Sequence, residues 1–123
     1  MHELAVCQAL LDEVERIARA QHAERVAAVR VRVGVLAGVE PELLQRAYEV
    51  ARAGTLAEGA ALAIEDSPVR VYCQRCGNES AASAQRLLCA VCGDWRTKVI
   101  AGDELMLMSV DLVAADRVQA GGS

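Results

Sequence analysis

Two pairs of cysteines, Cys73-Gln-Arg-Cys76 and Cys89-Ala-Val-Cys92, constrain the fold of this 123-residue chain more than any other feature. Twelve residues separate the pairs, a spacing that is typical of one metal ion held by four thiolates. A fifth cysteine, Cys7, stands alone, and an odd number of cysteines without an export signal argues against a disulfide framework. We therefore predict a structural zinc site formed by the four paired cysteines. A redox pair and an iron or iron–sulfur site are the alternatives.

A glycine follows each pair, Gly77 before Asn78 and Gly93 before Asp94. Glycine at this point lets the backbone turn tightly beneath the metal and direct N–H groups at the sulfurs. A segment of about thirty residues buries too little apolar surface to fold alone, so the metal would stabilise it. Residues 70–98 carry five basic and two acidic side chains, net +3, whereas the rest of the chain carries net −7. This basic excess can offset the charge of a zinc ion with four thiolates.

Two segments outside the cysteine region have the period of an amphipathic helix. The first covers residues 4–21, and its apolar face consists of Leu4, Cys7, Leu10, Leu11, Val14, Ile17 and Ala18. We expect Cys7 to be a core residue of this face rather than a redox thiol. The second covers residues 41–53, with Pro41 as its first residue and Gly54 as its C-cap. Its predicted inward residues are Leu43, Leu44, Ala47, Val50 and Ala51.

Other segments alternate apolar with polar or small residues, as half-buried strands do. Extended structure is expected over residues 29–35, 60–66, 69–71, 95–100 and 103–113. The last of these segments follows the cysteine pairs. We therefore predict an α/β body into which the metal module is inserted, with the final strand returning to the body.

The composition excludes several classes of protein. Hydrophobic residues make up 54% of the chain, yet it holds no Phe, one Trp and two Tyr, and its formal net charge is −4. A nucleic-acid-binding protein usually has a positive excess and aromatic side chains for base stacking. No apolar run is long enough for a membrane span and no signal peptide is recognisable, so we expect a cytoplasmic protein. We do not expect an enzyme, because no nucleophile–base pair, phosphate-binding glycine loop or paired catalytic carboxylates are present.

The chain begins Met1-His2-Glu3, directly before the first predicted helix. A free α-amine, the amide nitrogen of His2 and the His2 imidazole can close adjoining chelate rings around one ion, with Glu3 or another donor completing the ligand set. Nitrogen-rich planar coordination suits Ni(II) or Cu(II) better than zinc or magnesium. An ordinary solvent-exposed terminus is the alternative.

Several motifs together resemble the HypA/HybF family of hydrogenase-maturation nickel metallochaperones. The resemblance covers about residues 1–112, in the order and spacing of the family. Besides the two cysteine pairs, the matching segments are Met1-His2-Glu3-Leu4, residues 33–41 (VGVLAGVEP), Tyr48-Glu49-Val50, residues 54–60 (GTLAEGA), and Gly102-Asp103-Glu104-Leu105 with Ser109-Val110. Each piece alone is modest evidence, whereas the combination is specific.

The resemblance implies an α+β fold, with two helices packed on a three-stranded mixed sheet and an inserted zinc-ribbon-like module. Residues 1–69 and 101–113 would form a nickel-binding domain, 70–100 a zinc-binding domain and 114–123 a flexible tail. Ni(II) would be bound by Met1, His2 and Glu3, and Zn(II) by Cys73, Cys76, Cys89 and Cys92.

The resemblance also implies partners. The protein would deliver nickel, together with a HypB-type nickel GTPase, to the large subunit of [NiFe]-hydrogenase. A homodimer is left open, and neither nucleic acid nor a membrane is expected as a partner. The alternative is a zinc-ribbon module that binds nucleic acid or another protein, or a zinc-stabilised scaffold with an inert N-terminus.

The chain departs from the family's pattern at three points. One is the absence of Phe, because the second helix of relatives often has aromatic residues and here only Tyr48 remains. Some members supply a histidine from the zinc module to nickel, but this chain has only His2 and His22, and His22 is expected to be solvated. Backbone, carboxylate, water or a partner would then complete the nickel shell. We expect Glu40 to be a carboxylate at the start of the second helix, favoured by the helix dipole, and a role in the nickel site is the alternative. Met106 and Met108 occupy strand positions where relatives often have polar or basic groups, so we expect packing or a subunit contact there.

Overall fold

The computed structural model describes the backbone of residues 2–115 and the side chains of residues 3–115. Two helices lie in this part of the chain, α1 (His2–Ala20) and α2 (Pro41–Ala51). The strands are β1 (Ala23–Gly34), β2 (Ala61–Ser67), β3 (Arg70–Cys73), β4 (Glu79–Ala81), β5 (Thr97–Ala101) and β6 (Leu105–Ala114). Residues 116–123 of the predicted tail lie outside the described residues.

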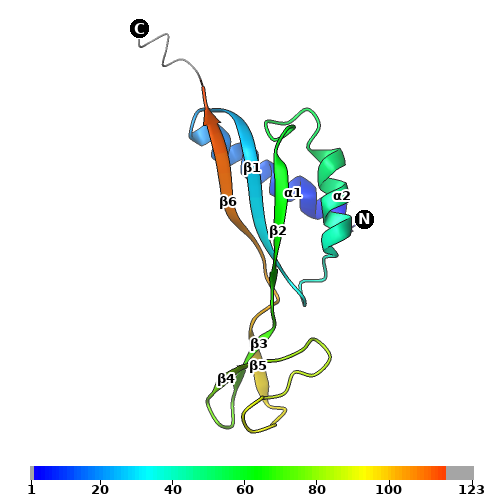
Figure 1. The fold of residues 1–123 in the computed structure, drawn as a ribbon, viewed down its shortest axis with the longest axis vertical. Coiled ribbons are helices and arrows are strands. Elements are labelled where there is room, and N and C mark those ends of the chain that lie inside the picture. Colours follow the sequence, from blue (N-terminus) through cyan, green and yellow to red (C-terminus); the bar gives the residue numbers. More distant parts are fainter. Residues whose placement is uncertain (1, 116–123) are drawn as a thin grey trace. The chain divides into compact units, whose positions relative to one another are not determined.

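The strands form two three-stranded sheets, one with the order β2-β1-β6 and one with the order β4-β3-β5 (Figure 1). At the end of β1, Gly34 N–H donates to Glu104 O (2.7 Å) and Val35 N–H donates to Ser67 O (3.4 Å). The end of β1 thus lies beside the end of β2 and the start of β6, so the first sheet is mixed. In the second sheet β3 pairs antiparallel with both neighbours. The predicted fold class, two helices with a mixed three-stranded sheet and a separate cysteine module, is confirmed.

The chain forms two compact units. The first, here called the helical unit, consists of Met1–Val31, Glu40–Ala63 and Leu107–Ser123. The second, here called the cysteine unit, consists of Arg32–Val39 and Ile64–Met106, and it takes in the ends of β1 and β2 and the start of β6. Neither helix of the described chain is long and apolar enough to cross a membrane.

The core of the helical unit is built from small and branched side chains because aromatic residues are scarce. On α1 and β1 the buried residues are Cys7, Leu10, Leu11, Val14, Ala18, Val26, Val29 and Val31. This confirms the predicted apolar face of α1 except at Leu4, which is 42% exposed, and at Ile17, which is half-buried. Cys7 is fully buried and its thiol donates to Leu44 O (3.4 Å), as a core residue would.

The inward face of α2 differs from the prediction. Leu44 and Tyr48 are fully buried, whereas Leu43 and Val50 are 45% and 73% exposed. Residues four apart share one side of a helix, and positions 43 and 50 lie on a different side from positions 44 and 48. Tyr48 takes the core position because its hydroxyl can donate to Ala60 O (2.9 Å). The predicted C-cap is also wrong: Arg52 caps α2, and Gly54 lies in the turn beyond it.

Two glycines permit a close approach of backbone segments in the cysteine unit. A Cβ atom at Gly34 would lie 2.2 Å from the carbonyl carbon of Gly102. Gly102 has φ +100°, and a Cβ atom there would lie 2.6 Å from Val69 Cα. The Glu104 carboxylate fixes the same region, because it accepts hydrogen bonds from Ser67 Oγ (2.6 Å) and Gly102 N–H (2.8 Å).

This crowding predicts that Gly102→Ala lowers the free energy of unfolding by about 3 kcal/mol or more, since backbone strain and a backbone clash combine there. Gly54→Ala is the matched control, because its φ of +78° is strained but no atom lies within 4 Å of the added Cβ. We expect it to cost about 1 kcal/mol. Urea unfolding of both variants measures the difference, and equal costs would show that the close approach does not matter.

Candidate metal centre

Each cysteine pair lies in the same tight turn. In the first, Gly77 N–H donates to Cys73 O (2.9 Å) and Cys73 N–H donates to Asn78 O (2.9 Å). The second turn repeats this pattern with Gly93 N–H to Cys89 O (2.8 Å) and Cys89 N–H to Asp94 O (3.0 Å). Both glycines have φ +79°, a left-handed conformation that other residues rarely adopt. The glycines that the sequence places after each pair are therefore required by the turn.

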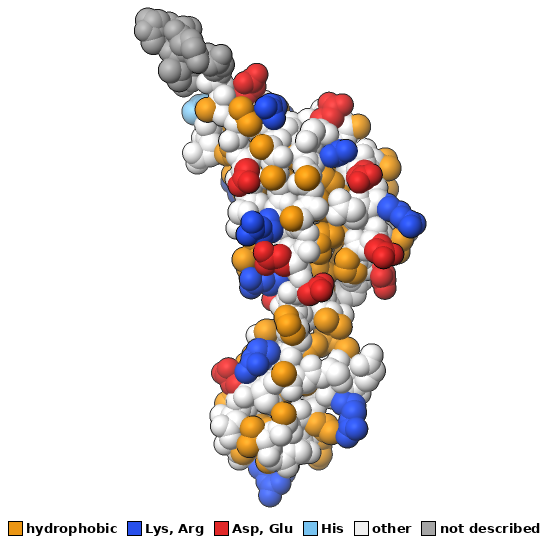
Figure 2. Space-filling view, in the orientation of Figure 1, with side chains coloured by type: hydrophobic (Ala, Val, Ile, Leu, Met, Phe, Trp, Pro, Cys, Tyr) orange, Lys and Arg blue, Asp and Glu red, His pale blue; other side chains and the backbone are white. Residues whose placement is uncertain are grey.

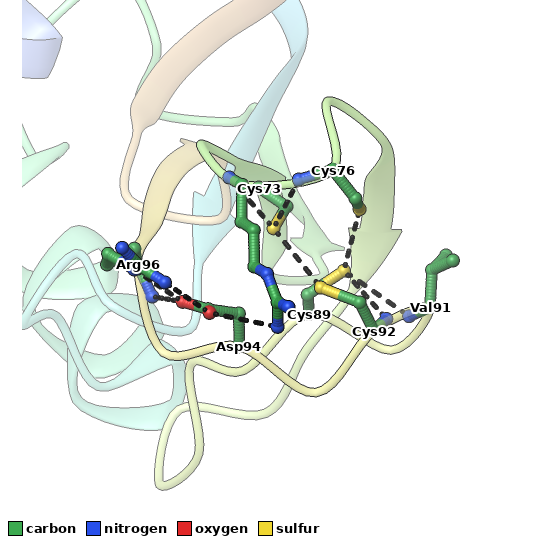
Figure 3. A network of polar contacts seen from close by, with 8 residues as sticks. Cys73, Cys76, Cys89, Val91, Cys92, Asp94 and Arg96 are labelled. Atoms are coloured by element: carbon green, nitrogen blue, oxygen red, sulfur yellow. Dashed lines mark hydrogen bonds and ion pairs between the residues drawn. The ribbon is translucent and has the colours of Figure 1, made fainter.

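The two turns direct backbone N–H groups at the first sulfur of each pair (Figure 3). Cys73 Sγ accepts hydrogen bonds from the N–H groups of Arg75 and Cys76, both at 3.4 Å. Cys89 Sγ accepts the equivalent bonds from Val91 (3.3 Å) and Cys92 (3.4 Å). These bonds favour the thiolate, so the pKa of Cys73 is lowered and that of Cys89 falls to about 6.

The four sulfurs converge on one point. The Sγ atoms of Cys73, Cys76, Cys89 and Cys92, here called the four-cysteine centre, all lie within 4.8 Å of one another. Two of the distances, Cys73–Cys92 and Cys76–Cys89, are 3.6 Å. A tetrahedron with metal–sulfur bonds of about 2.3 Å has edges of about 3.8 Å. The sulfurs are therefore spaced to hold one tetrahedral ion of the size of Zn(II).

The fourth thiol shows why this centre needs a metal. The N–H of Asp94 lowers the pKa of Cys92, but burial and the three neighbouring sulfurs outweigh it and raise that pKa to about 12. Four thiolates this close repel one another, so they do not all ionise near neutral pH without a cation. A metal ion would displace the remaining thiol protons as it binds.

Charged residues that the sequence did not single out surround the centre. Asp94, whose side chain is only 7% exposed, accepts hydrogen bonds from Arg96 N–H (2.7 Å), Nε (3.0 Å) and Nη2 (2.9 Å). Arg75 Nη1 approaches the same carboxylate at 3.6 Å. The Arg96 hydrogen bonds hold the pKa of Asp94 well below its usual range. Asp94 thus links the two turns and positions two guanidinium groups near the thiolates.

One signal in the sequence could have indicated this role. Asn78 and Asp94 occupy the same place after their glycines, and both contribute polar side chains to the centre. Asn78 Nδ2 donates to Cys76 Sγ (3.4 Å), while Asp94 binds the arginines. Among the described residues, the four-cysteine centre is the one cluster of His, Cys, Asp or Glu side chains arranged to hold a metal.

The other predicted metal site lies at the start of α1. Met1 and the side chain of His2 lie outside the described residues. Glu3 is in the first turn of α1, and its Oε2 accepts a hydrogen bond from the N–H of Glu40, the N-cap of α2 (3.2 Å). Two of the predicted carboxylates, Glu3 and Glu40, are thus neighbours. His22 is exposed in a left-handed turn, as expected of a solvated residue.

An α+β unit with two helices on a mixed sheet, combined with a ribbon-like four-cysteine unit, defines a small metal-binding protein. Residues 1–112 match the family model described as hydrogenase/urease nickel incorporation, metallochaperone, hypA. The hydrogenase maturation factor HypA of Nitrosospira multiformis is 49% identical over 113 residues, which are 92% of this chain and 98% of the relative. The HypA of Aquifex aeolicus is 40% identical over 112 residues, 91% of this chain and 97% of the relative.

The fold agrees with these relatives. The solution structure of the Ni metallochaperone HypA from Helicobacter pylori superposes with a TM-score of 0.70 at 25% identity, covering 92% of this chain and 98% of that one. The chain belongs to the HypA family of hydrogenase maturation factors. It is a nickel metallochaperone rather than an enzyme, as the sequence predicts.

The four-cysteine centre leads to a prediction about metal titration. Addition of Co(II), a spectroscopic substitute for Zn(II), to the metal-free protein should give the spectrum of a tetrahedral thiolate complex with one ion per chain. The same titration should release protons, and the affinity should fall as the pH falls, because Cys92 and its neighbours must be deprotonated to bind.

Absorption spectroscopy in a weakly buffered indicator solution measures both effects. Cys89→Ser should weaken Co(II) binding and reduce the thiolate-to-cobalt charge-transfer absorption, whereas Cys7→Ala, which removes the cysteine of the helical unit, should leave both unchanged. An unchanged spectrum and affinity in Cys89→Ser would contradict the assignment.

Proposed function

We propose that this protein binds Ni(II) at its N-terminus, carries a structural Zn(II) ion and delivers nickel in the cytoplasm to the large subunit of [NiFe]-hydrogenase. A HypB-type nickel GTPase assists the transfer. Ni(II) is bound by Met1, His2 and Glu3 in a domain formed by residues 1–69 and 101–113. Zn(II) is bound by Cys73, Cys76, Cys89 and Cys92 in a domain of residues 70–100. The observation that carries this proposal is the family match over residues 1–112, which begins at the Met1-His2-Glu3 motif.

The geometry of the four-cysteine centre supports zinc as the resident ion. Sulfur–sulfur distances of 3.6 Å suit a closed tetrahedral shell, which leaves no position open for a substrate. The cysteine unit has a small core, and Val69, Val71, Cys73 and Cys89 are among its few buried apolar residues. Zinc therefore supplies stability that the unit cannot obtain from apolar burial.

The start of α1 supports a nickel site of a different kind. A helix that begins at His2 leaves the N–H groups of its first turn without intrahelical acceptors, so a metal can take the amide nitrogen without breaking a helical hydrogen bond. The amine, amide and imidazole nitrogens form a planar donor set that suits Ni(II). The hydrogen bond from Glu40 N–H holds the Glu3 carboxylate at the same end of the helix.

The delivery step requires a partner. The chain contains no glycine-rich phosphate-binding loop of the G-x-x-x-x-G-K-[ST] type, so hydrolysis of GTP belongs to another protein. A site on the first turn of a helix is also accessible to a second protein, which favours ligand exchange over permanent binding.

The N-terminal assignment predicts that His2→Ala weakens Ni(II) binding by about 100-fold or more, because it removes the imidazole donor and opens one of the two chelate rings. Adding two residues before Met1 should have a similar effect, since the α-amine would become an amide. Isothermal titration with Ni(II) on the untagged, zinc-loaded protein measures the loss.

His22→Ala is the matched control, because it removes the other histidine, which is exposed at the far end of α1. It should leave the nickel affinity unchanged, and zinc content should be the same in all variants. Nickel binding that survives both His2→Ala and the extension would refute the N-terminal site while leaving the zinc assignment intact.

Nickel binding should also depend on pH. The imidazole and the α-amine, with ordinary pKa values of about 6.5 and 7.7–8, must lose their protons to bind, so protons compete with nickel. Between about pH 7.5 and about pH 5.5 we expect the affinity to fall by about 100-fold or more. An affinity that stays constant over this range would exclude the amine and imidazole as ligands.

A further inference from the structure

The single tryptophan of the chain lies on the surface of the cysteine unit. Trp95 is 74% exposed, although the chain has no Phe and only two Tyr to supply aromatic side chains to its core. An exposed tryptophan leaves a large apolar ring in contact with water. Tryptophan and arginine are also the residues that most often dominate the energy of protein–protein interfaces. Trp95 is therefore the residue of this unit best suited to contact another protein.

The tryptophan is accompanied by an arginine that is held in place before any partner binds. The guanidinium carbon of Arg96 lies over the Trp95 ring, 5.9 Å from its centroid. Arg96 Nε and Nη2 donate to the Asp94 carboxylate at 3.0 and 2.9 Å. The backbone is fixed as well, because Thr97 N–H donates to Trp95 O at 2.8 Å. Side chains that are already ordered lose less conformational entropy when a partner binds.

A second guanidinium group lies beside the first. Arg75 Nη1 is 3.6 Å from Asp94 Oδ2, the same oxygen that accepts the hydrogen bond from Arg96 Nη2. The side chains of Arg75 and Arg96 are 61% and 53% exposed, whereas that of Asp94 is 7% exposed. A guanidinium group has five N–H donors, and the contacts with Asp94 leave several of them for another acceptor. Trp95, Arg96 and Arg75 are here called the Trp95 patch.

The charge around the Trp95 patch is complementary to an acidic partner. Residues 70–98 carry net +3, and the rest of the chain carries net −7. A zinc ion with four thiolates would add a charge of −2 and leave this segment at about +1. In the view of Figure 2, acidic side chains gather on the part of the molecule that contains the helices, and the part that contains β3, β4 and β5 shows mainly basic ones.

We propose that the Trp95 patch binds an acidic segment of another protein. Carboxylates of that segment would accept hydrogen bonds from Arg75 and Arg96, and a neighbouring apolar side chain would pack on the face of the Trp95 ring that Arg96 leaves open. Guanidinium and carboxylate groups match in both charge and geometry, and hydrogen bonds between charged groups are stronger than those between neutral groups.

Two other occupants fit the Trp95 patch less well. A nucleic acid would find a single aromatic ring for base stacking, and the net charge of −4 of the whole chain repels a long polyanion. A second copy of this chain would have to offer a different, acidic surface to the patch. Such a contact between unlike surfaces links identical molecules into rings or filaments.

Tryptophan fluorescence of the full, zinc-loaded chain tests the proposal directly, because Trp95 is the one tryptophan in the sequence. The probe is the peptide EELEELEE, blocked at both ends, and the control peptide is QQLQQLQQ. We expect the acidic peptide to shift the emission to shorter wavelength, since its leucine side chains displace water from the ring. It should bind about tenfold or more tightly than the control peptide, and added salt should weaken its binding.

Two arginine variants locate the binding site. Arg75→Gln should weaken binding of the acidic peptide by about fivefold or more, because it removes one guanidinium group and leaves Trp95 and Arg96 in place. Arg86→Gln is the matched control, since it removes the same charge from an exposed arginine of the same unit that, within residues 3–115, forms no ion pair with Asp94. It should change the affinity by less than about twofold.

Trp95→Ala removes the apolar part of the patch. Its peptide binding is followed by calorimetry, because this variant has no tryptophan to report on binding, and we expect a loss of about fivefold or more. Zinc content should equal that of the parent protein in all variants. If Trp95→Ala loses zinc, the comparison of Arg75→Gln with Arg86→Gln decides alone.

Failure of the acidic peptide to bind, or an equal loss of affinity in Arg75→Gln and Arg86→Gln, would overturn the proposal. Tighter binding of an oligothymidylate than of the acidic peptide would assign the patch to nucleic acid, and a change of oligomeric state in Trp95→Ala would assign it to a second copy. Either result would also overturn the proposal. The inference does not depend on the nickel site, and nickel titration of the same samples keeps the two outcomes separate.

Discussion

The convergence of four sulfurs on one point is the interaction on which the cysteine unit depends. Strands β3, β4 and β5 are three to five residues long and bury few apolar side chains, among them Val71. Apolar burial of this extent does not offset the entropy of ordering such a segment. A metal ion bound by four thiolates would compensate for this deficit, and the two glycine turns place the four sulfurs at tetrahedral spacing.

Four thiolates around one zinc ion would concentrate negative charge, and the surrounding residues offset it. A zinc ion with four thiolates carries a charge of about −2 in a small volume. Backbone N–H groups reduce this charge locally at Cys73 and Cys89, and Asp94 holds the guanidinium groups of Arg75 and Arg96 nearby. The Asp94 carboxylate alone would be unfavourable beside thiolates. Together with the guanidinium groups of Arg75 and Arg96, however, it forms a cluster whose net charge is positive.

The sequence predicted those parts of the fold and site that follow from local patterns. The cysteine spacing indicated the metal centre, and the periodicity of residues 4–21 indicated α1 to within two residues. It misjudged α2, because Tyr48 became a core residue only through the distant acceptor Ala60 O. The contact between Arg75 and Asp94 and the hydrogen bond between Glu3 and Glu40 join residues 19 and 37 positions apart, which no local sequence pattern encodes.

The two metals have different proposed roles, Zn(II) as a retained structural ion and Ni(II) as a delivered ion, and this difference follows from the chemistry of their ligands. Soft thiolates in a closed shell retain Zn(II), and removing the ion would require several thiolates to be released together. Nitrogen donors on the first turn of α1 would occupy only part of the coordination shell of Ni(II). Protons compete with nickel for two of these donors near neutral pH. One ion is thus fixed by a structure that it stabilises. The other would be bound by donors on the first turn of one helix, outside any closed shell of protein ligands, which is the property that a delivered metal needs.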